Sequence, residues 1–323
     1  MTDFMTVFKT VFFAMLEIFI LGACGFIMVR KKFLDETSLR FLMRLVVEFL
    51  LPLFIFTKTL KSFSFILYPN WWIFTLFGLA INLAGFLIGY FWLGLFKTVN
   101  PNSEKRQFVS LVGFQNSGYI PLILAATLLS PFEAEKMYIY IFLLLLGFNI
   151  VIWSFGVRFL SGHSVRKFEL GSMFSPPVLA TILSMGLIGS GLDKFIPKFV
   201  FEPAQMLGNC LLPLAMIVTG SNLAIVSLKN VKKAIVANIV FLKLILLPVL
   251  ALILFWYIKP EHLTGLFVIF QVAMPSATSL SLIAWHYKQD DTIISHGIFF
   301  THLFCILSIP FWIIIYELFA FFR

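Results

Sequence analysis

One apolar stretch concentrates polar and helix-breaking residues of the types that bind ligands. Residues 113–122 read GFQNSGYIPL and lie within an apolar stretch that runs from 107 to 129. Pro121 lacks an N–H and would clash with the carbonyl of Ser117 in a continuous helix, while Gly118 tolerates an irregular backbone just before it. An interrupted helix frees carbonyls on one half and N–H groups on the other. The N-terminal end of the second half carries a positive partial charge, which suits a carboxylate.

A second apolar stretch, from 264 to 285, has a matching arrangement. Residues 271–279 read QVAMPSATS. Pro275 would interrupt the helix near its middle, and the hydroxyl residues that follow it suit the start of a new helical half. The candidate substrate-binding residues of the two stretches are Gln115, Asn116, Ser117, Gly118, Tyr119, Pro121, Gln271, Pro275, Ser276, Thr278 and Ser279. The alternative is an ordinary proline kink in each helix, with the hydroxyl groups bonded back to the same helix.

Four ionisable residues fall inside apolar stretches, where a charge is costly and is usually functional or paired. They are Glu17, Arg44, Glu48 and Lys243. Glu48 lies one turn from Arg44, and this spacing predicts an intrahelical ion pair. Lys243 has no acidic neighbour in sequence, so it either extends to the helix end or supplies a fixed cation in place of a coupling ion. Glu17 is a candidate proton-coupling carboxylate, although a position beside a polar partner is the favoured interpretation.

Uncharged polar residues also occur within the apolar stretches. Asn82, Asn209, Thr219 and Asn222 are candidates to line a cavity or to join helices, and Asn209 is included among the candidate substrate-binding residues. The sequence contains no HExxH, GxSxG or phosphate-binding glycine motif. It therefore predicts neither an enzyme nor a cofactor or metal site.

The composition indicates which elements position these residues. The chain has 323 residues, of which 60% are hydrophobic and 12% charged, whereas an average soluble domain is about 45–50% apolar and about 25% charged. This excess predicts an all-α polytopic protein in the lipid bilayer of a cell membrane. Cys24, Cys210 and Cys305 are widely spaced in apolar runs, which predicts small buried side chains rather than disulfides or a zinc site. The net charge of +9 falls in short clusters between apolar runs, which argues against nucleic acid as a partner.

A spanning helix needs about 20 mostly apolar residues, and charge clusters divide the chain into about ten such stretches. The predicted spans are 8–29, 38–57, 70–95, 107–129, 138–157, 175–192, 203–225, 234–257, 264–285 and 293–320. The longest connection, around residues 160–174, contains His163, Arg166 and Lys167. The first span is too long for a cleaved signal. Lys and Arg are more frequent in the loops that follow odd-numbered spans, which predicts both termini on the non-cytoplasmic side.

The two halves of the chain share a weak repeat. An LLPL sequence occurs at 50–53 and again at 211–214, and this interval nearly equals the interval between Pro121 and Pro275. Each interval maps a span onto the span five later, so the second half would be inverted relative to the first. Inverted repeats are typical of secondary transporters, whose sites lie at interrupted helices near the bilayer midplane. The predicted repeats are residues 1–160 and 170–323.

Over essentially its whole length, the sequence resembles the auxin efflux carrier family, which includes plant auxin exporters and bacterial malate and malonate permeases. The match rests on the 113–122 segment, SPP at 175–177, LPLA at 212–215, GSNL at 220–223, Lys243-Leu244 with Pro248, and AMP at 273–275. The resemblance implies a fold of two inverted five-helix halves with crossed, interrupted helices in spans 4 and 9. Spans 1, 2, 6 and 7 would form a scaffold, often with a homodimer contact, and the other spans a mobile transport domain.

The resemblance also implies a function. By position, Asn116, Pro121 and Pro275 would mark the helix crossing and the substrate site. The expected activity is secondary active transport of a small organic anion, such as a carboxylate, by elevator-like alternating access.

Two other functions are weighed against this one. A sodium-coupled organic anion symporter similar to the bile acid family would share the inverted architecture but would require sodium. A non-transporting membrane sensor is disfavoured because the sequence offers no soluble signalling segment. Substrate, coupling ion, direction of transport and oligomeric state are left open by the sequence.

Overall fold

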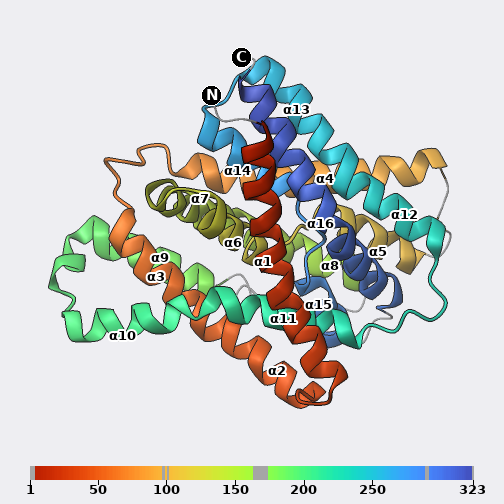
Figure 1. Cartoon of the computed structure of the whole chain (residues 1–323), viewed down its shortest axis with the longest axis horizontal. Helices are drawn as coiled ribbons and strands as arrows, with labels where there is room; N and C mark the ends of the chain where they lie inside the picture. The colour runs from red at the N-terminus through yellow and green to blue at the C-terminus, as the bar shows by residue number, and fades with distance from the viewer. Residues whose placement is uncertain (1–3, 97–98, 100–101, 163–173, 288–290, 322–323) are drawn as a thin grey trace.

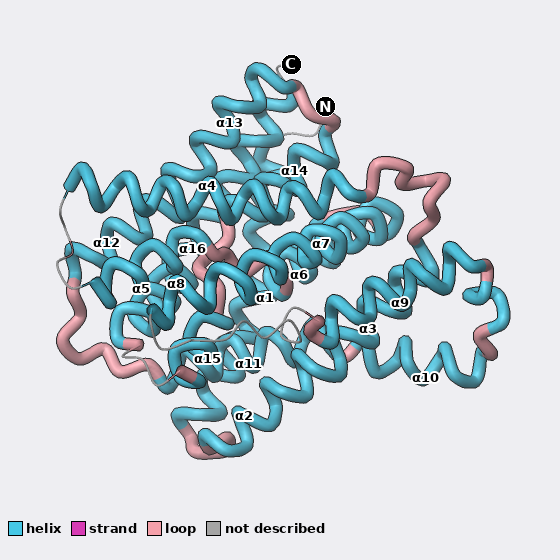
Figure 2. The backbone as a smooth tube through the Cα atoms, turned by 180° about the vertical axis from the view of Figure 1, so that it is seen from behind, coloured by secondary structure: helices cyan, strands magenta, loops and turns pink. Residues whose placement is uncertain are grey.

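The protein is described by a computed structural model in which all regular elements of the described part are helical (Figures 1 and 2). The described residues are 4–96, 99, 102–162, 174–287 and 291–321. The predicted connection with His163, Arg166 and Lys167 lies outside them.

Helices occupy each of the predicted spans. The first half contains α1 (Phe4–Arg30), α2 (Glu36–Leu45), η1 (Val46–Leu50), α3 (Leu51–Ser62), α4 (Trp72–Phe96), α5 (Asn102–Gly113), α6 (Tyr119–Leu128), α7 (Pro131–Val151), η2 (Ile152–Gly156) and α8 (Val157–Ser161). The second contains α9 (Pro176–Ser190), η5 (Leu192–Phe195), α10 (Lys198–Asn209), α11 (Leu211–Ile225), α12 (Lys233–Phe241), η6 (Leu242–Leu246), α13 (Leu247–Ile258), α14 (His262–Val272), α15 (Ser279–His286) and α16 (Thr292–Phe321). Within the described residues, six helical runs are long and apolar enough to cross a membrane, and three shorter apolar helices accompany them. The prediction of an all-helical, multi-span membrane protein is confirmed at this level.

Local sequence explains where several helices begin. Ser130 caps α7 by accepting a hydrogen bond from the backbone N–H of Glu133, whose side chain accepts one from the Ser130 N–H in return. Asp35 caps α2 by accepting a hydrogen bond from the backbone N–H of Ser38, and hydrogen bonds from Ser38 lower the pKa of the Asp35 carboxyl.

Two of the wide π-helical turns precede prolines. The turn η1 lies just before Pro52, and η6 lies just before Pro248. Because proline cannot donate to the carbonyl four residues earlier, that carbonyl needs another partner. The carbonyl of Leu244 has one, since the indole Nε1 of Trp312 on α16 donates to it at 2.6 Å.

Glycines allow two helix pairs to approach closely. The helices α1 and α11 pack together, and a Cβ at Gly220 would lie 1.8 Å from the backbone oxygen of Gly22. The helices α4 and α7 pack in the same way, and a Cβ at Gly78 would lie 2.3 Å from the carbonyl oxygen of Leu144. Small residues let the backbones of two membrane helices approach closely. The helices then gain van der Waals contact, which drives their association because lipid provides no hydrophobic driving force.

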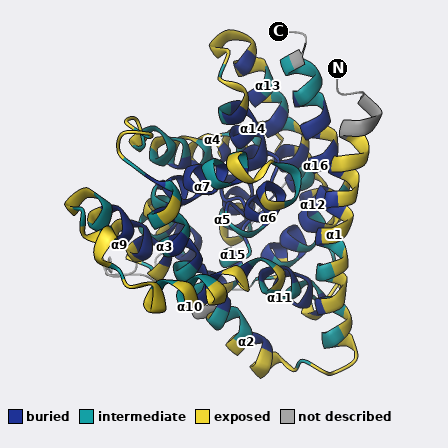
Figure 3. Ribbon diagram, turned by 60° about the vertical axis from the view of Figure 1, so that its left-hand side comes forward, coloured by how far each residue is buried: buried dark blue, intermediate teal, exposed yellow. Residues whose placement is uncertain are grey.

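Burial is concentrated in α5, α6, α7 and α14, which lie in the centre of the bundle (Figure 3). The outer faces of α1, α4 and α13 are rich in exposed apolar side chains, as lipid contact requires. The prediction of buried cysteines is correct for Cys305 and wrong for Cys24 and Cys210, which are exposed. An apolar run in a membrane protein does not imply burial, because lipid accepts the same side chains.

Ion pairs between segments follow the predicted alternation of loops. Lys232 contacts Glu104, and the sequence assigns both to the same side. Lys58 pairs with Glu135 at 2.5 Å, and the sequence assigns both to the other side. The beginning of α1 and the end of α16 lie at the same end of the molecule (Figure 1).

Candidate functional site

Two helical runs are interrupted in the centre of the molecule. In the first run, α5 ends at Gly113 and α6 begins at Tyr119. In the second run, α14 ends at Val272 and α15 begins at Ser279. Pro121 lies in the first turn of α6, where its missing N–H has no helical partner to lose. Pro275 lies within the second interruption itself.

The two interruptions are joined by backbone hydrogen bonds. The N–H of Asn116 donates to the carbonyl of Pro275 at 2.8 Å, and the N–H of Ala277 donates to the carbonyl of Phe114 at 3.0 Å. They form an isolated antiparallel bridge between Gln115 and Ser276. We call the two linked segments, residues 114–118 and 273–278, the crossover. Its paired backbone groups explain how extended chain is tolerated in the protein interior.

Side chains from the second interruption and from α16 complete this pairing. The hydroxyl of Ser276 donates to the carbonyl of Leu111 near the end of α5, at 2.8 Å. The N–H of Ser276 donates to the hydroxyl of Thr301 on α16, at 3.2 Å. The first bond holds the end of α5 against the crossover, and the second holds α16 there.

Lys243 reaches the crossover from η6. Its side chain is 1% exposed, and Nζ lies 3.0 Å from the carbonyl oxygen of Val112 and 3.5 Å from Oε1 of Gln115. Val112 lies in the last turn of α5, where the helix dipole is negative and favours a cation. Of the two alternatives for Lys243, the structure therefore contradicts extension to the helix end.

Asn116 contacts α16 through its side-chain amide. Its Nδ2 lies 3.3 Å from Nε2 of His302, whose Nδ1 lies 2.8 Å from the carbonyl oxygen of Ile298. Two glutamines near the crossover have amide atoms without a hydrogen-bond partner among the described residues: Nε2 of Gln115 and both amide atoms of Gln271. Such buried polar groups are costly, and a ligand, ion or water is the usual explanation.

A cavity of about 150 Å³ borders the crossover. We call it the crossover cavity. Gly118 and Tyr119 at the start of α6 line it, together with Thr278 and Ser279 at the start of α15. The remaining lining residues with polar side chains are Gln115, Asn116, Ser117, Asn149, Trp153 and Ser175. Two helix N-termini therefore face one cavity.

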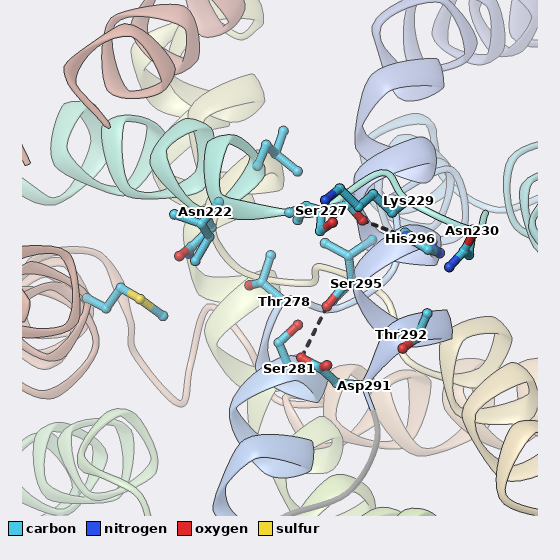
Figure 4. A pocket seen from close by; sticks show the side chains of 15 residues that line it. Asn222, Ser227, Lys229, Asn230, Thr278, Ser281, Asp291, Thr292, Ser295 and His296 are labelled. Carbon is cyan, nitrogen blue, oxygen red and sulfur yellow. Dashed lines mark hydrogen bonds between the residues drawn. The ribbon is translucent and has the colours of Figure 1, made fainter. Parts of the chain in front are cut away.

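A larger cavity of about 470 Å³ lies beyond it, toward the side that holds the Lys229 loop (Figure 4). We call it the vestibule. It shares Thr278 with the crossover cavity, and it is lined by Lys229, by His296, whose Nε2 lies 2.8 Å from the carbonyl of Ser227, and by Asp291.

A family model described as a membrane transport protein, the auxin efflux carrier family, matches residues 10–167 and 161–313. This chain belongs to that family. The resemblance drawn from sequence is thereby confirmed, and a transport family points to a protein that is not an enzyme. A comparison with curated proteins finds no match.

Three predicted residues of this transporter lie away from the crossover. Asn209 is exposed at the end of α10 and does not line the crossover cavity. Glu17 is exposed near the middle of α1, and no polar partner for it is found among the described residues. Glu48 forms the predicted intrahelical ion pair with Arg44, at 2.7 Å.

Sequence reasoning missed two residues that the transporter brings to the crossover. Thr301 and His302 lie side by side on α16 and are each at most 2% exposed. The only sign of them in the sequence is a hydroxyl and an imidazole side chain within a long apolar stretch. Neither has a partner nearby in sequence that would distinguish a site from an isolated polar residue.

Proposed function

We propose that this transporter moves a small organic anion and binds the carboxylate of that anion in the crossover cavity. The observation that carries the proposal is the convergence of two helix starts, α6 and α15, on one cavity. The first turn of a helix has unpaired N–H groups and a positive partial charge, both suited to a carboxylate. Asn116, Ser117 and Thr278 add side-chain hydrogen-bond groups at the same place.

A thermal-shift screen of the purified transporter tests this proposal. Acetate, malonate, malate and indole-3-acetate cover one and two carboxylates and small and large apolar parts. We expect at least one of them to raise the unfolding temperature, because a ligand that binds only the folded state stabilises it. Absence of a shift with all four, at millimolar concentration, would contradict binding of a simple carboxylate.

Asn116→Ala is expected to weaken binding of the carboxylate found in that screen by about 10- to 100-fold. A hydrogen bond to a charged group contributes about 1.5–3 kcal/mol, and alanine removes it. Calorimetric titration measures the dissociation constant. The matched control is Asn70→Ala, which removes an exposed asparagine from the loop before α4. Equal affinities of the two variants would exclude Asn116 from the site.

We further propose that Lys243 is a fixed cation that acts in place of a bound coupling ion. Its ammonium group lies between the end of α5 and Gln115, and no acidic side chain lies within salt-bridge distance of it in the described part of the chain. A positive charge at this position would attract an anion without sodium. The membrane potential then drives an anion out of a negative interior, by about 2.3 kcal/mol per charge per 100 mV.

The inverted repeat, with halves 1–160 and 170–323, is part of the same proposal. Helix packing supports it, because equivalent pairs contact each other in both halves. The helices α1 and α11 (spans 1 and 7) correspond to α9 and α3 (spans 6 and 2), and both pairs pack together. The helices α4 and α7 (spans 3 and 5) correspond to α12 and α16 (spans 8 and 10), which also pack together. The antiparallel bridge at the crossover fits a two-fold relation.

The places where the structure is open and closed support the proposal of alternating access. Both cavities lie toward the predicted cytoplasmic side. At the other side, Lys58 on α3 pairs with Glu135 on α7, and Ser62 donates to the same carboxylate at 2.7 Å. We propose that this contact joins the scaffold to the transport domain and opens during an elevator-like movement.

Glu135→Gln is expected to lower the free energy of unfolding by about 1–2 kcal/mol, because it weakens a largely buried, charged hydrogen-bond pair. For a chain of this size, that corresponds to a fall in unfolding temperature of about 1.5–3 °C. Glu48→Gln is the control, since its pair with Arg44 is exposed and contributes little. Equal unfolding temperatures for the two variants would show that the Lys58–Glu135 contact is weak.

Two further proposals concern the surroundings of the protein. A homodimer through the scaffold helices would cover the exposed carboxylate of Glu17, which is costly against lipid. Both termini are proposed to lie on the non-cytoplasmic side, which is supported by the loop charges and by the common position of the two chain ends (Figure 1).

A further inference from the structure

His302 lies directly behind the proposed anion site. It belongs to α16, is 2% exposed, and contacts Asn116 through Nε2. On its other side is an apolar cavity of about 260 Å³ between α1, α11 and α16. The proposed binding of a carboxylate does not use this imidazole.

The hydrogen bonds of the ring define its protonation state. Nδ1 lies 2.8 Å from the carbonyl oxygen of Ile298, and a carbonyl only accepts, so Nδ1 carries a hydrogen. Nε2 faces the amide nitrogen of Asn116, which only donates. Nε2 is therefore an acceptor, and the ring is neutral in this arrangement.

Protonation would reverse the second of these bonds. A proton from solution forms an N–H bond at Nε2, and that nitrogen then becomes a donor. Asn116 satisfies a donor only by turning its side-chain amide so that Oδ1 faces His302. The NH₂ group of Asn116 then faces away from the ring, toward the crossover cavity that Asn116 lines.

We propose that His302 and Asn116 form a proton-linked switch of the anion site, in which protonation of His302 turns the Asn116 amide donor toward the bound carboxylate. The inference rests on the proposed function. The protonated ring also adds a positive charge next to the residue that contacts the anion. Proton and anion therefore each favour the binding of the other, and this coupling is reciprocal.

The surroundings of His302 make the anion its counter-charge. From α1, α6 and α11, the residues that line the adjacent cavity are apolar apart from Thr219, and Cys305 on α16 itself is the other titratable residue in that lining. On the crossover side, the titratable groups are Tyr119 and Lys243. None of these groups supplies a negative charge at neutral pH. A carboxylate in the crossover cavity would do so.

The ring and the amide can be observed without any ligand. In the purified transporter with ¹⁵N-labelled histidine and asparagine, we expect the Nδ1–H tautomer of His302 at about pH 8. On acidification, the ring nitrogens and the side-chain amide of Asn116 should shift together. The signals are assigned by their loss in His302→Gln and Asn116→Ala. Three results would overturn the switch: an Nε2–H tautomer at about pH 8, a ring that does not titrate above about pH 5, or an Asn116 amide signal that does not shift when the ring titrates.

Calorimetry with malonate, in two buffers of different ionisation enthalpy, measures the coupling. The wild-type transporter should take up as much as about one proton per malonate, so its affinity should rise by at most about tenfold per pH unit of acidification. His302→Gln should bind malonate with no proton uptake. His262→Gln is the control, because this histidine pairs with Glu317 at the surface and should leave proton uptake unchanged.

The two arms separate the possible failures. Malonate binding with equal proton uptake in the wild type and in His302→Gln would overturn the switch but leave the anion site intact. If the ring and amide signals shift together but malonate does not bind, the switch is supported and the proposed substrate class is contradicted.

Discussion

Replacing Lys243 by methionine is expected to reduce carboxylate uptake into proteoliposomes by at least about 100-fold. The ammonium group donates to the carbonyl of Val112 at 3.0 Å and lies 3.5 Å from Oε1 of Gln115. A charged hydrogen bond of this kind contributes about 1.5–3 kcal/mol, and the attraction between the cation and a bound anion is lost in addition. Methionine keeps an unbranched side chain, one heavy atom shorter, and removes the charge and the hydrogen-bond donors.

The fold should survive this substitution. A buried charge carries a large desolvation cost, so an apolar residue of similar volume is often tolerated or even stabilising. Thermal unfolding should therefore show a change of at most about 5 °C. Lys233→Met is the matched control, because Lys233 is exposed at the start of α12 in the same helical run. Uptake by Lys243→Met within tenfold of the control would refute a role for the fixed cation.

The same experiment separates the two transporter mechanisms. A fixed cation predicts that uptake by the wild type is equal in sodium and in choline buffers. A symporter similar to the bile acid family would take up the carboxylate in the sodium buffer but not in the choline buffer. A sodium requirement in the wild type would therefore count against Lys243 as a substitute for a coupling ion, whatever the effect of its substitution.

The interruptions of the two helices were predictable because their causes are local. At 121 and 275, proline lacks the N–H that a regular helix needs, and the glycine or hydroxyl residues beside it favour a break over a simple kink. Sequence could not indicate that Pro121 sits inside the first turn of α6, while Pro275 lies in the interruption and accepts a hydrogen bond from Asn116. The position of a proline relative to a helix start depends on the tertiary partner that satisfies the free backbone groups.

The direction of a buried side chain was beyond sequence reasoning. Lys243 lies about three turns from the start of its helical run at Lys233, which is compatible both with extension toward the surface and with an internal position. The rotation of η6 against α5 decides between them, and this rotation depends on packing between distant segments. His302 is the stronger case, because its partner Asn116 is 186 positions away in the chain.

Gly78→Ala is expected to lower the free energy of unfolding by about 2–3 kcal/mol, and occasionally overpacking of this kind costs more. An added Cβ would lie 2.3 Å from the carbonyl oxygen of Leu144 and 3.0 Å from the nitrogen of Phe148, both backbone atoms of α7. Backbone cannot rotate away as a side chain can, so α4 and α7 would have to separate. Differential scanning fluorimetry should show a fall in unfolding temperature of about 3–5 °C.

The control for this substitution lies on the same helix. At Gly94 an added Cβ meets no described atom within 4 Å, and alanine is a better helix former than glycine, so Gly94→Ala should be neutral or stabilise by up to about 1 kcal/mol. Equal unfolding temperatures for Gly78→Ala and Gly94→Ala would show that the approach of α4 to α7 is not a tight constraint.

The contact between α4 and α7 is reciprocal, and this makes the effect of a double substitution informative. A Cβ at Gly147 on α7 would lie 2.1 Å from the carbonyl oxygen of Thr75 on α4. If either alanine forces the helices apart, the second meets a gap that has already opened. The combined loss for Gly78→Ala with Gly147→Ala should therefore be smaller than the sum of the two single losses. Additive losses would mean that each clash is relieved locally. In that case α4 and α7 would not have separated.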